Sequence, residues 1–397
     1  MRTVKELFAY VAGGCVGLLC LAGPLTAQPT VGVTESEIVI GSCSAQTGPS
    51  QKLGQQMFLG ASTYIDTVNM AGGIHGRKIR LIKEDDGYDP AKAEECFKRL
   101  QSQKVFADAF FVGTPTAKKY VPLAEESKVP LVGLFTGAQL IYEPLHHYVF
   151  NIRASYFDET REQVDGLWRL GMKRVAVIRA DDAFGDAVLL GVQTALKRYG
   201  TEPVAVASFP RETGNVEPAV MAVKAASPDA VILVGSYAPV ADIIRRAHRS
   251  KWSPLFLTVS FVGTDEFIEE AKSDAEGTVI TQVVPPWNLS AFYRTVGTYR
   301  GEMTKRNLQP GYVSLEGFVD AMVVVEALKR AGRDLTREKF IHALESMHDG
   351  IQGMDLGDKL KINFSPTSHK GFQGVFMTVV RGGSPVPVTD WSQVAKK

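Results

Sequence analysis

The sequence predicts an α/β protein with two doubly wound, mainly parallel-sheet lobes joined by three crossing segments. The chain has 397 residues, too long for one compact domain and suited to two lobes. Its hydrophobic fraction of 45% and charged fraction of 22% are those of a globular protein. Short β-branched runs alternate with longer amphipathic stretches, and helices between strands require the crossover connections of parallel sheets.

Residues 1–27 have the pattern of a cleaved secretory signal peptide rather than of a fold element. Arg2 and Lys5 give a basic start, residues 7–21 are almost wholly apolar, and small residues precede a predicted cleavage after Ala27. A retained membrane anchor and a lipoprotein anchored through a nearby cysteine are the alternatives. We therefore expect an exported, periplasmic protein.

The first run of elements, residues 28–152, predicts one lobe. Residues 52–70 carry apolar side chains at helical spacing, glycines end that helix, and Pro90 opens the next one. The predicted elements are strand 38–40, helix 52–70, strand 79–82, a helix from residue 90, strand 110–112, helix 117–127, and strands 131–132 and 148–152.

The second run, residues 153–285, repeats this alternation and predicts the other lobe. Pro285-Pro286 mark a crossing, because two prolines cannot continue a central strand. Residues 286–361 should return to the first lobe, and residues 362–397 should end in the second lobe with a strand and a hairpin. The three crossings are expected near residues 152–155, 284–287 and 361–365. The predicted elements are helices 157–170, 186–199, 216–225, 240–249, 289–306, 315–331 and 337–346, and strands 175–178, 204–209, 230–234, 255–258, 278–284 and 374–380.

Export would remove two of the four cysteines and leave Cys43 and Cys96. A cysteine pair in an oxidising compartment can form a disulfide. Cys43 ends the first predicted strand, whereas Cys96 lies on the helix after the second, so spacing alone does not bring them within bridging distance. A disulfide and two buried free thiols are equal alternatives.

Charge and motifs argue against several function classes. Lys and Arg total 44 against 43 Asp and Glu, which gives a net charge of +1 and no general attraction to nucleic acid or anionic lipid. No nucleophile elbow, phosphate-binding loop, dinucleotide fingerprint or zinc-protease motif occurs. His146-His147 is interpreted as a solvated turn, and Asp85-Asp86 as caps of the turn into a helix. We expect no enzyme, no cofactor and no metal site.

Small polar loops follow several predicted strands, where open α/β sheets bind ligands. In residues 111–117, Thr114 is a suitable N-cap for the helix that follows. Hydroxyls and free N–H groups at a helix N-terminus can hold a carboxylate, here through Thr114 and the Thr116 amide, although a plain capped helix explains the same residues. Residues 47–50 and 135–138 can line the same crevice.

Several short motifs follow one another along the chain. They are Ile40-Gly41-Ser42, Thr47-Gly48-Pro49, residues 69–74 (NMAGGI), residues 85–90 (DDGYDP), residues 181–185 (DDAFG) and residues 274–277 (DAEG). Their order and spacing over about residues 34–380 resemble the extracytoplasmic substrate-binding proteins of ABC importers, in the Leu/Ile/Val-binding class of type I periplasmic binding proteins. The resemblance implies a monomer whose lobes close on a small amino acid or related organic acid for an inner-membrane ABC permease.

The resemblance also implies ligand contacts. The carboxylate-holding Ser/Thr of the family falls on Thr114, the next loop on residues 135–137, and the covering aromatic on Phe184. Tyr156, just past the first crossing, either faces the cleft or packs in the hinge. With the tyrosine-bearing loop of the second lobe included, the predicted ligand-binding residues are Thr114, Thr116, Phe135, Thr136, Gly137, Tyr156, Phe184, Tyr237 and Ser260.

Ser260 departs from the family pattern. In amino-acid binders this position carries the acid that meets the ligand's ammonium, and a buried ammonium without such a partner is unfavourable. The sequence therefore favours an aromatic or short aliphatic acid or amide, unless Asp265 or Glu266 supplies the charge. A sensory protein of the same fold that docks on a membrane signalling partner, and a secreted α/β enzyme, are the competing functions.

Overall fold

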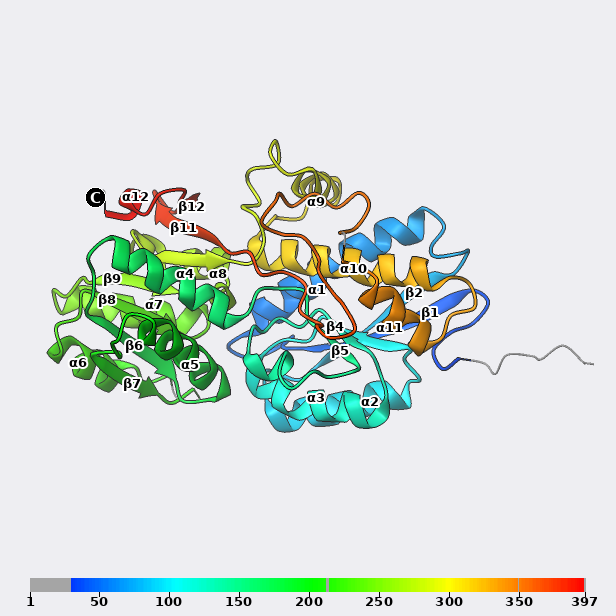
Figure 1. Cartoon of the computed structure of the whole chain (residues 1–397), viewed down its shortest axis with the longest axis horizontal. Helices are drawn as coiled ribbons and strands as arrows, with labels where there is room; N and C mark the ends of the chain where they lie inside the picture. The colour runs from blue at the N-terminus through cyan, green and yellow to red at the C-terminus, as the bar shows by residue number, and fades with distance from the viewer. Residues whose placement is uncertain (1–29, 212–213, 349, 396–397) are drawn as a thin grey trace, which may run out of the picture.

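The computed structural model describes residues 30–211, 214–348 and 350–395, so the predicted signal peptide lies outside these ranges. Two lobes lie side by side, each built on its own sheet (Figure 1). The predicted fold class is confirmed, because both sheets are mainly parallel and helices connect their strands. No helix in the described ranges combines the length and apolarity that crossing a bilayer requires.

The first lobe holds a five-stranded parallel sheet. Its strands are β1 (Glu37–Ser44), β2 (Lys78–Asp85), β3 (Ala107–Ala109), β4 (Leu131–Val132) and β5 (Val149–Phe150). Its helices are α1 (Gln51–Met70), α2 (Pro90–Ser102), α3 (Thr114–Ser127), α9 (Arg294–Lys305), α10 (Tyr312–Ala331) and α11 (Arg337–Glu345). The strand order is β2-β1-β3-β4-β5. Figure 1 shows α1 and α10 above this sheet and α2 and α3 below it, which gives the expected three layers.

The second lobe holds a seven-stranded sheet. Its strands are β6 (Val175–Ala180), β7 (Ala205–Phe209), β8 (Ala230–Val234), β9 (Leu255–Thr258), β10 (Val279–Gln282), β11 (Phe376–Arg381) and β12 (Ser384–Pro387). Its helices are α4 (Tyr156–Arg169), α5 (Ala183–Lys197), α6 (Glu217–Ala225), α7 (Tyr237–Arg249), α8 (Thr264–Ala271) and α12 (Ser392–Ala395). The order is β12-β11-β10-β9-β8-β6-β7, and only the pairs of β11 with β10 and β12 are antiparallel. The predicted terminal hairpin is therefore confirmed.

The predicted strand at 110–112 is wrong. Strand β3 covers residues 107–109, and Phe110 has φ 64°, which takes the chain out of the ladder directly afterwards. The apolar run 110–112 is buried without being a strand, although Val112 makes one bridge to Phe135. The polar Asp108 concealed the true strand, because a charged residue type is unusual in a buried strand; one oxygen of its buried carboxyl group accepts a hydrogen bond from Gln101 Nε2 at 2.7 Å, and the other has no hydrogen-bond partner in the described ranges.

The first and third connections between the lobes run alongside each other. Gly371 N donates to Asn151 O at 2.8 Å, and Phe372 N donates to Ile152 O at 2.6 Å. Phe364 still packs on Phe150 of the first sheet, so the chain leaves for β11 after residue 372, later than the expected 361–365. We call residues 151–155 and 370–372 the hinge ribbon. The other predicted boundaries of the lobes stay predictions.

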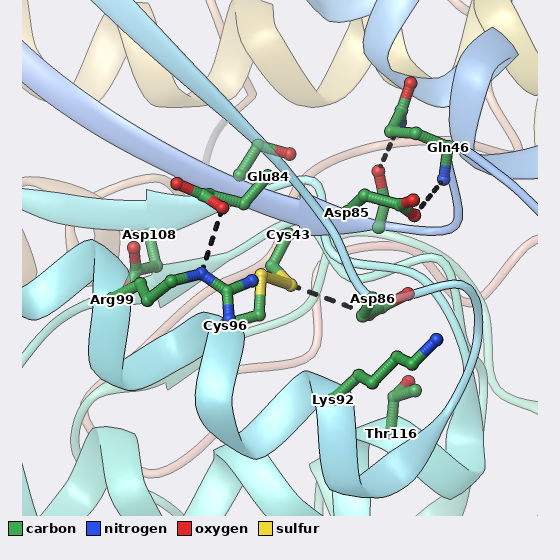
Figure 2. The surroundings of a disulfide bond; sticks show 12 residues. Cys43, Gln46, Glu84, Asp85, Asp86, Lys92, Cys96, Arg99, Asp108 and Thr116 are labelled. Atoms are coloured by element: carbon green, nitrogen blue, oxygen red, sulfur yellow. Dashed lines mark hydrogen bonds and ion pairs between the residues drawn. A yellow bond between two sulfur atoms is a disulfide. The ribbon is translucent and has the colours of Figure 1, made fainter.

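A disulfide joins Cys43 at the end of β1 to Cys96 on α2, with the two Cα atoms 6.3 Å apart (Figure 2). This decides between the two alternatives left open by the sequence. Asp86 lies beside the bridge, and its carboxylate accepts the Tyr88 N–H at 2.8 Å. The bond therefore holds α2 against the carboxyl end of β1, an interior strand of the sheet, next to the turn that carries Tyr88. Asp86 acts in that turn as predicted.

Candidate ligand-binding site

A cavity of about 510 Å³ lies between the lobes. Loops that follow β1 and β2 line it from the first lobe, and loops that follow β6, β7 and β8 line it from the second. These are carboxyl ends of parallel strands, where open α/β sheets bind ligands. Its aromatic lining residues are Tyr88, Phe184, Phe209 and Phe261. Its charged lining residues are Asp89, Asp182, Arg211 and Asp242.

The N-terminus of α3 carries the predicted carboxylate seat. The N-cap is Gly113 rather than the predicted Thr114. This position requires a glycine, because its φ is 106° and a Cβ there would lie 2.0 Å from the Tyr88 ring. Thr114 is the first helical residue, and its hydroxyl lies 2.7 Å from that of Thr136. The Thr116 hydroxyl donates to Val112 O at 2.6 Å, so only its amide is available to a ligand.

Aromatic rings from both lobes meet across the cleft. The predicted residues Tyr156 and Phe184, both of the second lobe, have ring centroids 5.4 Å apart. Phe261, which the sequence analysis missed, lies 5.2 Å from Phe135 and 4.5 Å from Phe184. Tyr88 was missed as well and lies 5.9 Å from Phe261. Two signals in the sequence could have indicated them: Phe261 directly follows Ser260, and Tyr88 is the tyrosine of the DDGYDP motif.

Arg153 is the most important residue that sequence analysis missed. Its side chain is 1% exposed and lies at the hinge ribbon. Its guanidinium stacks on Phe135 at 4.9 Å and donates a hydrogen bond to the Ser260 hydroxyl. Nη1 lies 3.3 Å from Glu316 on α10, and Nη2 lies 3.4 Å from Glu159 on α4. Arg153 therefore ties an acid of the first lobe to an acid and a hydroxyl of the second.

Three buried carboxyl groups surround this single guanidinium. Burial alone would lower the pKa of Arg153, but Glu316 and Glu159 raise it above its ordinary value. Burial raises the pKa of Glu316 to about 7 against the opposing effect of Arg153. Burial and Glu316 raise the pKa of Asp320 well above its ordinary value. We call Arg153, Glu159, Ser260, Glu316 and Asp320 the hinge-side cluster; the raised pKa values of its acids favour their protonated forms and so limit its net negative charge.

Glu159 accepts hydrogen bonds from the polar groups around Ser260, the position at which amino-acid binders are expected to carry an acid. Its carboxylate accepts Ser260 N at 2.7 Å, Ser260 Oγ at 3.0 Å and the Thr281 hydroxyl at 2.5 Å, and it faces Arg153. A carboxylate offers about four lone-pair positions. Glu159 is therefore fully occupied within the protein.

The two acids considered as substitutes for this position are also engaged or neutral. Asp265 accepts Trp287 Nε1 at 3.0 Å and Tyr312 N at 2.6 Å. Burial raises the pKa of Glu266 to about 8, which favours the neutral form of its carboxyl group. Tyr237, a predicted ligand-binding residue at the start of α7, lies near Glu266. The Lys52 ammonium of the first lobe lies 5.8 Å from the centroid of the Tyr237 ring.

The predicted residues gather at the lobe interface, but they do not all border the cavity. Phe184 lines it, whereas Tyr156 and Ser260 lie buried among the hinge-side residues. The carbonyl of Gly137 is already engaged within the protein, because it accepts a hydrogen bond from Tyr156 N at 2.7 Å. The predicted residues that do not line the cavity are Thr114, Thr116, Phe135, Thr136, Gly137, Tyr156, Tyr237 and Ser260. Their contact with ligand stays a prediction.

Known proteins share this architecture. A family profile described as "Periplasmic binding protein" matches residues 37–384. A protein named "Amino acid binding protein" from Pseudomonas aeruginosa is 24% identical over 241 residues, which cover 59% of this chain and 64% of that protein. The chain thus spans slightly less than two thirds of that relative.

Two solved structures extend the comparison. A possible leucine/isoleucine/valine-binding protein from Rhodopirellula baltica is 30% identical with a TM-score of 0.85, covering 93% of this chain and 99% of that one. A branched chain amino acid ABC transporter protein from Thermus thermophilus with bound valine is 20% identical with a TM-score of 0.81, covering 90% and 97%, and shares the fold. The chain belongs to the periplasmic binding protein family, a family of solute binders and not of enzymes.

Proposed function

We propose that this protein is the solute-binding component of an ABC import system, acting in the periplasm and delivering a small solute to an inner-membrane ABC permease. The observation that carries the proposal is the cavity of about 510 Å³ between the carboxyl-end loops of both sheets. Small-molecule sites typically measure about 300–1,000 Å³. The relatives named as amino-acid binders, one of them solved with valine, support the same role.

The lobes close on the solute by bending at the hinge ribbon. A ligand in the cavity contacts loops of both lobes, so it stabilises the closed form through contacts that the open form lacks. The expected result is a smaller radius of gyration in small-angle scattering when a saturating ligand is added. An identical radius with and without bound ligand would contradict closure.

The solute carries a carboxylate or amide and no α-ammonium. The paired hydroxyls of Thr114 and Thr136 stand at a helix N-terminus, where free N–H groups favour a carboxylate. The acid nearest to Ser260, Glu159, is already occupied by Ser260, Thr281 and Arg153. An ammonium group placed beside Ser260 would therefore meet no free carboxylate there, and the aromatic side chains of the cavity suit a flat or short aliphatic body.

Two measurements test the ligand class. Mass spectrometry of the solute that co-purifies with the exported protein should identify an organic acid or amide. A thermal-shift panel should then pair amino acids with their des-amino counterparts, and the acids should raise the melting temperature more. If leucine, isoleucine or valine stabilise the protein and the matched acids do not, Ser260 has been misinterpreted and the protein is an ordinary amino-acid binder.

Solute uptake separates import from sensing. Deletion of the gene should abolish uptake of the radiolabelled solute, and the wild-type gene should restore it. A sensory protein of the same fold would bind the same solute, but its loss would leave uptake unchanged.

A further inference from the structure

Tyr88 and Arg211 connect the two lobes beside the cavity, which both residues line. Tyr88 follows β2 in the first lobe, and Arg211 follows β7 in the second. Arg211 Nη1 donates a hydrogen bond to Tyr88 O at 3.0 Å, and the guanidinium carbon lies 5.3 Å from the centroid of the Tyr88 ring. One arginine of the second lobe therefore contacts both the backbone and the ring of a single first-lobe residue.

These two residues follow strands that lie far from the hinge ribbon in each sheet. The hinge ribbon begins directly after β5 and leads into β11. In the first sheet, β2 is the edge strand opposite β5. In the second sheet, β11 lies beside the edge strand β12, and β7 is the opposite edge. Bending at the hinge ribbon therefore moves Tyr88 and Arg211 apart more than residues near the ribbon, so their contacts should form only when the lobes are closed.

The surrounding structure holds both residues in place for this contact. Tyr88 has φ 62°, which is unusual for a residue with a bulky side chain. The Asp86 carboxylate accepts the Tyr88 N–H at 2.8 Å, and Gly113 leaves room for the Tyr88 ring. In the second lobe, Arg211 Nε lies 3.8 Å from Asp182 Oδ2. Backbone conformations of this kind persist where neighbouring groups fix them, and they gather at ligand clamps and switch regions.

We propose that the contact between Arg211 and Tyr88 is a latch that holds the lobes closed over the cavity and so retains a solute there. The inference rests on the closure about the hinge ribbon that is part of the proposed function. A cation over an aromatic ring and a hydrogen bond from a charged donor both stabilise the closed form, to a modest extent because the Arg211 side chain is 26% exposed. Together they should raise the ratio of closed to open molecules by roughly three- to thirtyfold, with or without solute.

The test measures the distance between the lobes by double electron–electron resonance, with no solute added. Spin labels on Lys119→Cys in α3 and Met221→Cys in α6 report on the first and second lobes, and both positions are exposed. Cys43 and Cys96 of the exported protein are bonded to each other and do not react with the label. In this labelled background, Arg211→Met should reduce the population at the closed distance in favour of longer distances.

The matched control is Arg179→Met, because the partners of Arg179 are Asp181 and Asp186 of its own lobe. A larger loss of the closed population in Arg211→Met than in Arg179→Met supports the latch. Equal populations in the labelled background and in Arg211→Met overturn it, as do a loss in Arg179→Met at least as large and a background protein without a closed population. Because no solute is present, each of these outcomes leaves the role in import to be decided separately by the uptake measurement.

Discussion

The two ends of the lobe interface differ in chemistry and in packing. On the hinge side, Arg153 lies among buried acids of both lobes, within hydrogen-bond or ion-pair distance of Ser260, Glu159 and Glu316. On the outer side, four aromatic residues line a cavity of about 510 Å³ together with small and charged residues. A buried charge has strict geometric requirements, whereas apolar walls accept different occupants of suitable shape. We therefore expect the hinge side to determine how the lobes meet and the outer side to determine which solute they accept.

The largest expected loss of stability comes from a substitution in the hinge-side cluster. Arg153→Met removes the only guanidinium in the hinge-side cluster and leaves its acids without their counter-charge. Removing one partner of a buried ion pair costs about 3–5 kcal/mol, so urea unfolding should show a loss of that size in the free energy of unfolding. Arg161→Met is the control, because Arg161 is half exposed in its pair with Asp158 and should cost at most about 1 kcal/mol. Equal losses in the two variants would refute the special role of the cluster.

The next effect acts on the outer side through the Cys43–Cys96 bridge. The bond joins residues 53 apart in sequence and supports the turn that presents Tyr88 to the cavity. Removing a disulfide of this kind costs about 2–4 kcal/mol. The double variant Cys43→Ala/Cys96→Ala and the wild-type protein under reducing conditions should lose the same amount in urea unfolding. A wild-type protein that keeps its full stability when reduced would contradict this expectation.

The two sides also differ in how well the sequence predicts their residues. Elements with clear periodicity, such as α1 and α10, were predicted closely, whereas β3 was displaced because a buried aspartate lies in the strand and Phe110 leaves it at positive φ. The family pattern indicated Phe184, a residue of the outer side. It did not indicate Arg153, because the partners of Arg153 come from α4, α10 and the turn after β9, and only the folded chain brings them together.

The affinity for the solute tests the predicted role of the two threonines at the N-terminus of α3. Thr114→Val removes a hydroxyl that we expect to bind the solute's carboxylate, and a hydrogen bond to a charged group is worth about 1.5–3 kcal/mol, or roughly ten- to a hundredfold in affinity. Calorimetry should show this loss in a folded protein. Thr116→Val is the matched control, since that hydroxyl donates to Val112 O just before the helix and its loss should lower stability rather than affinity. Unchanged affinity in Thr114→Val would remove Thr114 from the site.

The smallest effect concerns the pH dependence of the hinge side. Burial raises the pKa of Glu316 to about 7, above its value in the unfolded chain, so the folded protein holds this proton more tightly. The stability that this proton supplies is present below the unfolded pKa and is lost as pH rises through about 7.

Glu316→Gln should therefore make the fall in stability between about pH 5 and pH 8 shallower, by at most one proton or about 1.4 kcal/mol per pH unit. The other groups that face Glu316 are Arg153, Glu159 and Asp320; burial also raises the pKa of Glu159 and of Asp320, so part of the fall should persist. Urea unfolding at several pH values measures the slope. Glu326→Gln is the control, because Glu326 lies on the same helix but pairs with Arg330 outside the cluster. A slope that Glu316→Gln leaves unchanged would mean that Glu316 does not exchange its proton in this range, and Arg153 would then hold it ionised in the folded protein.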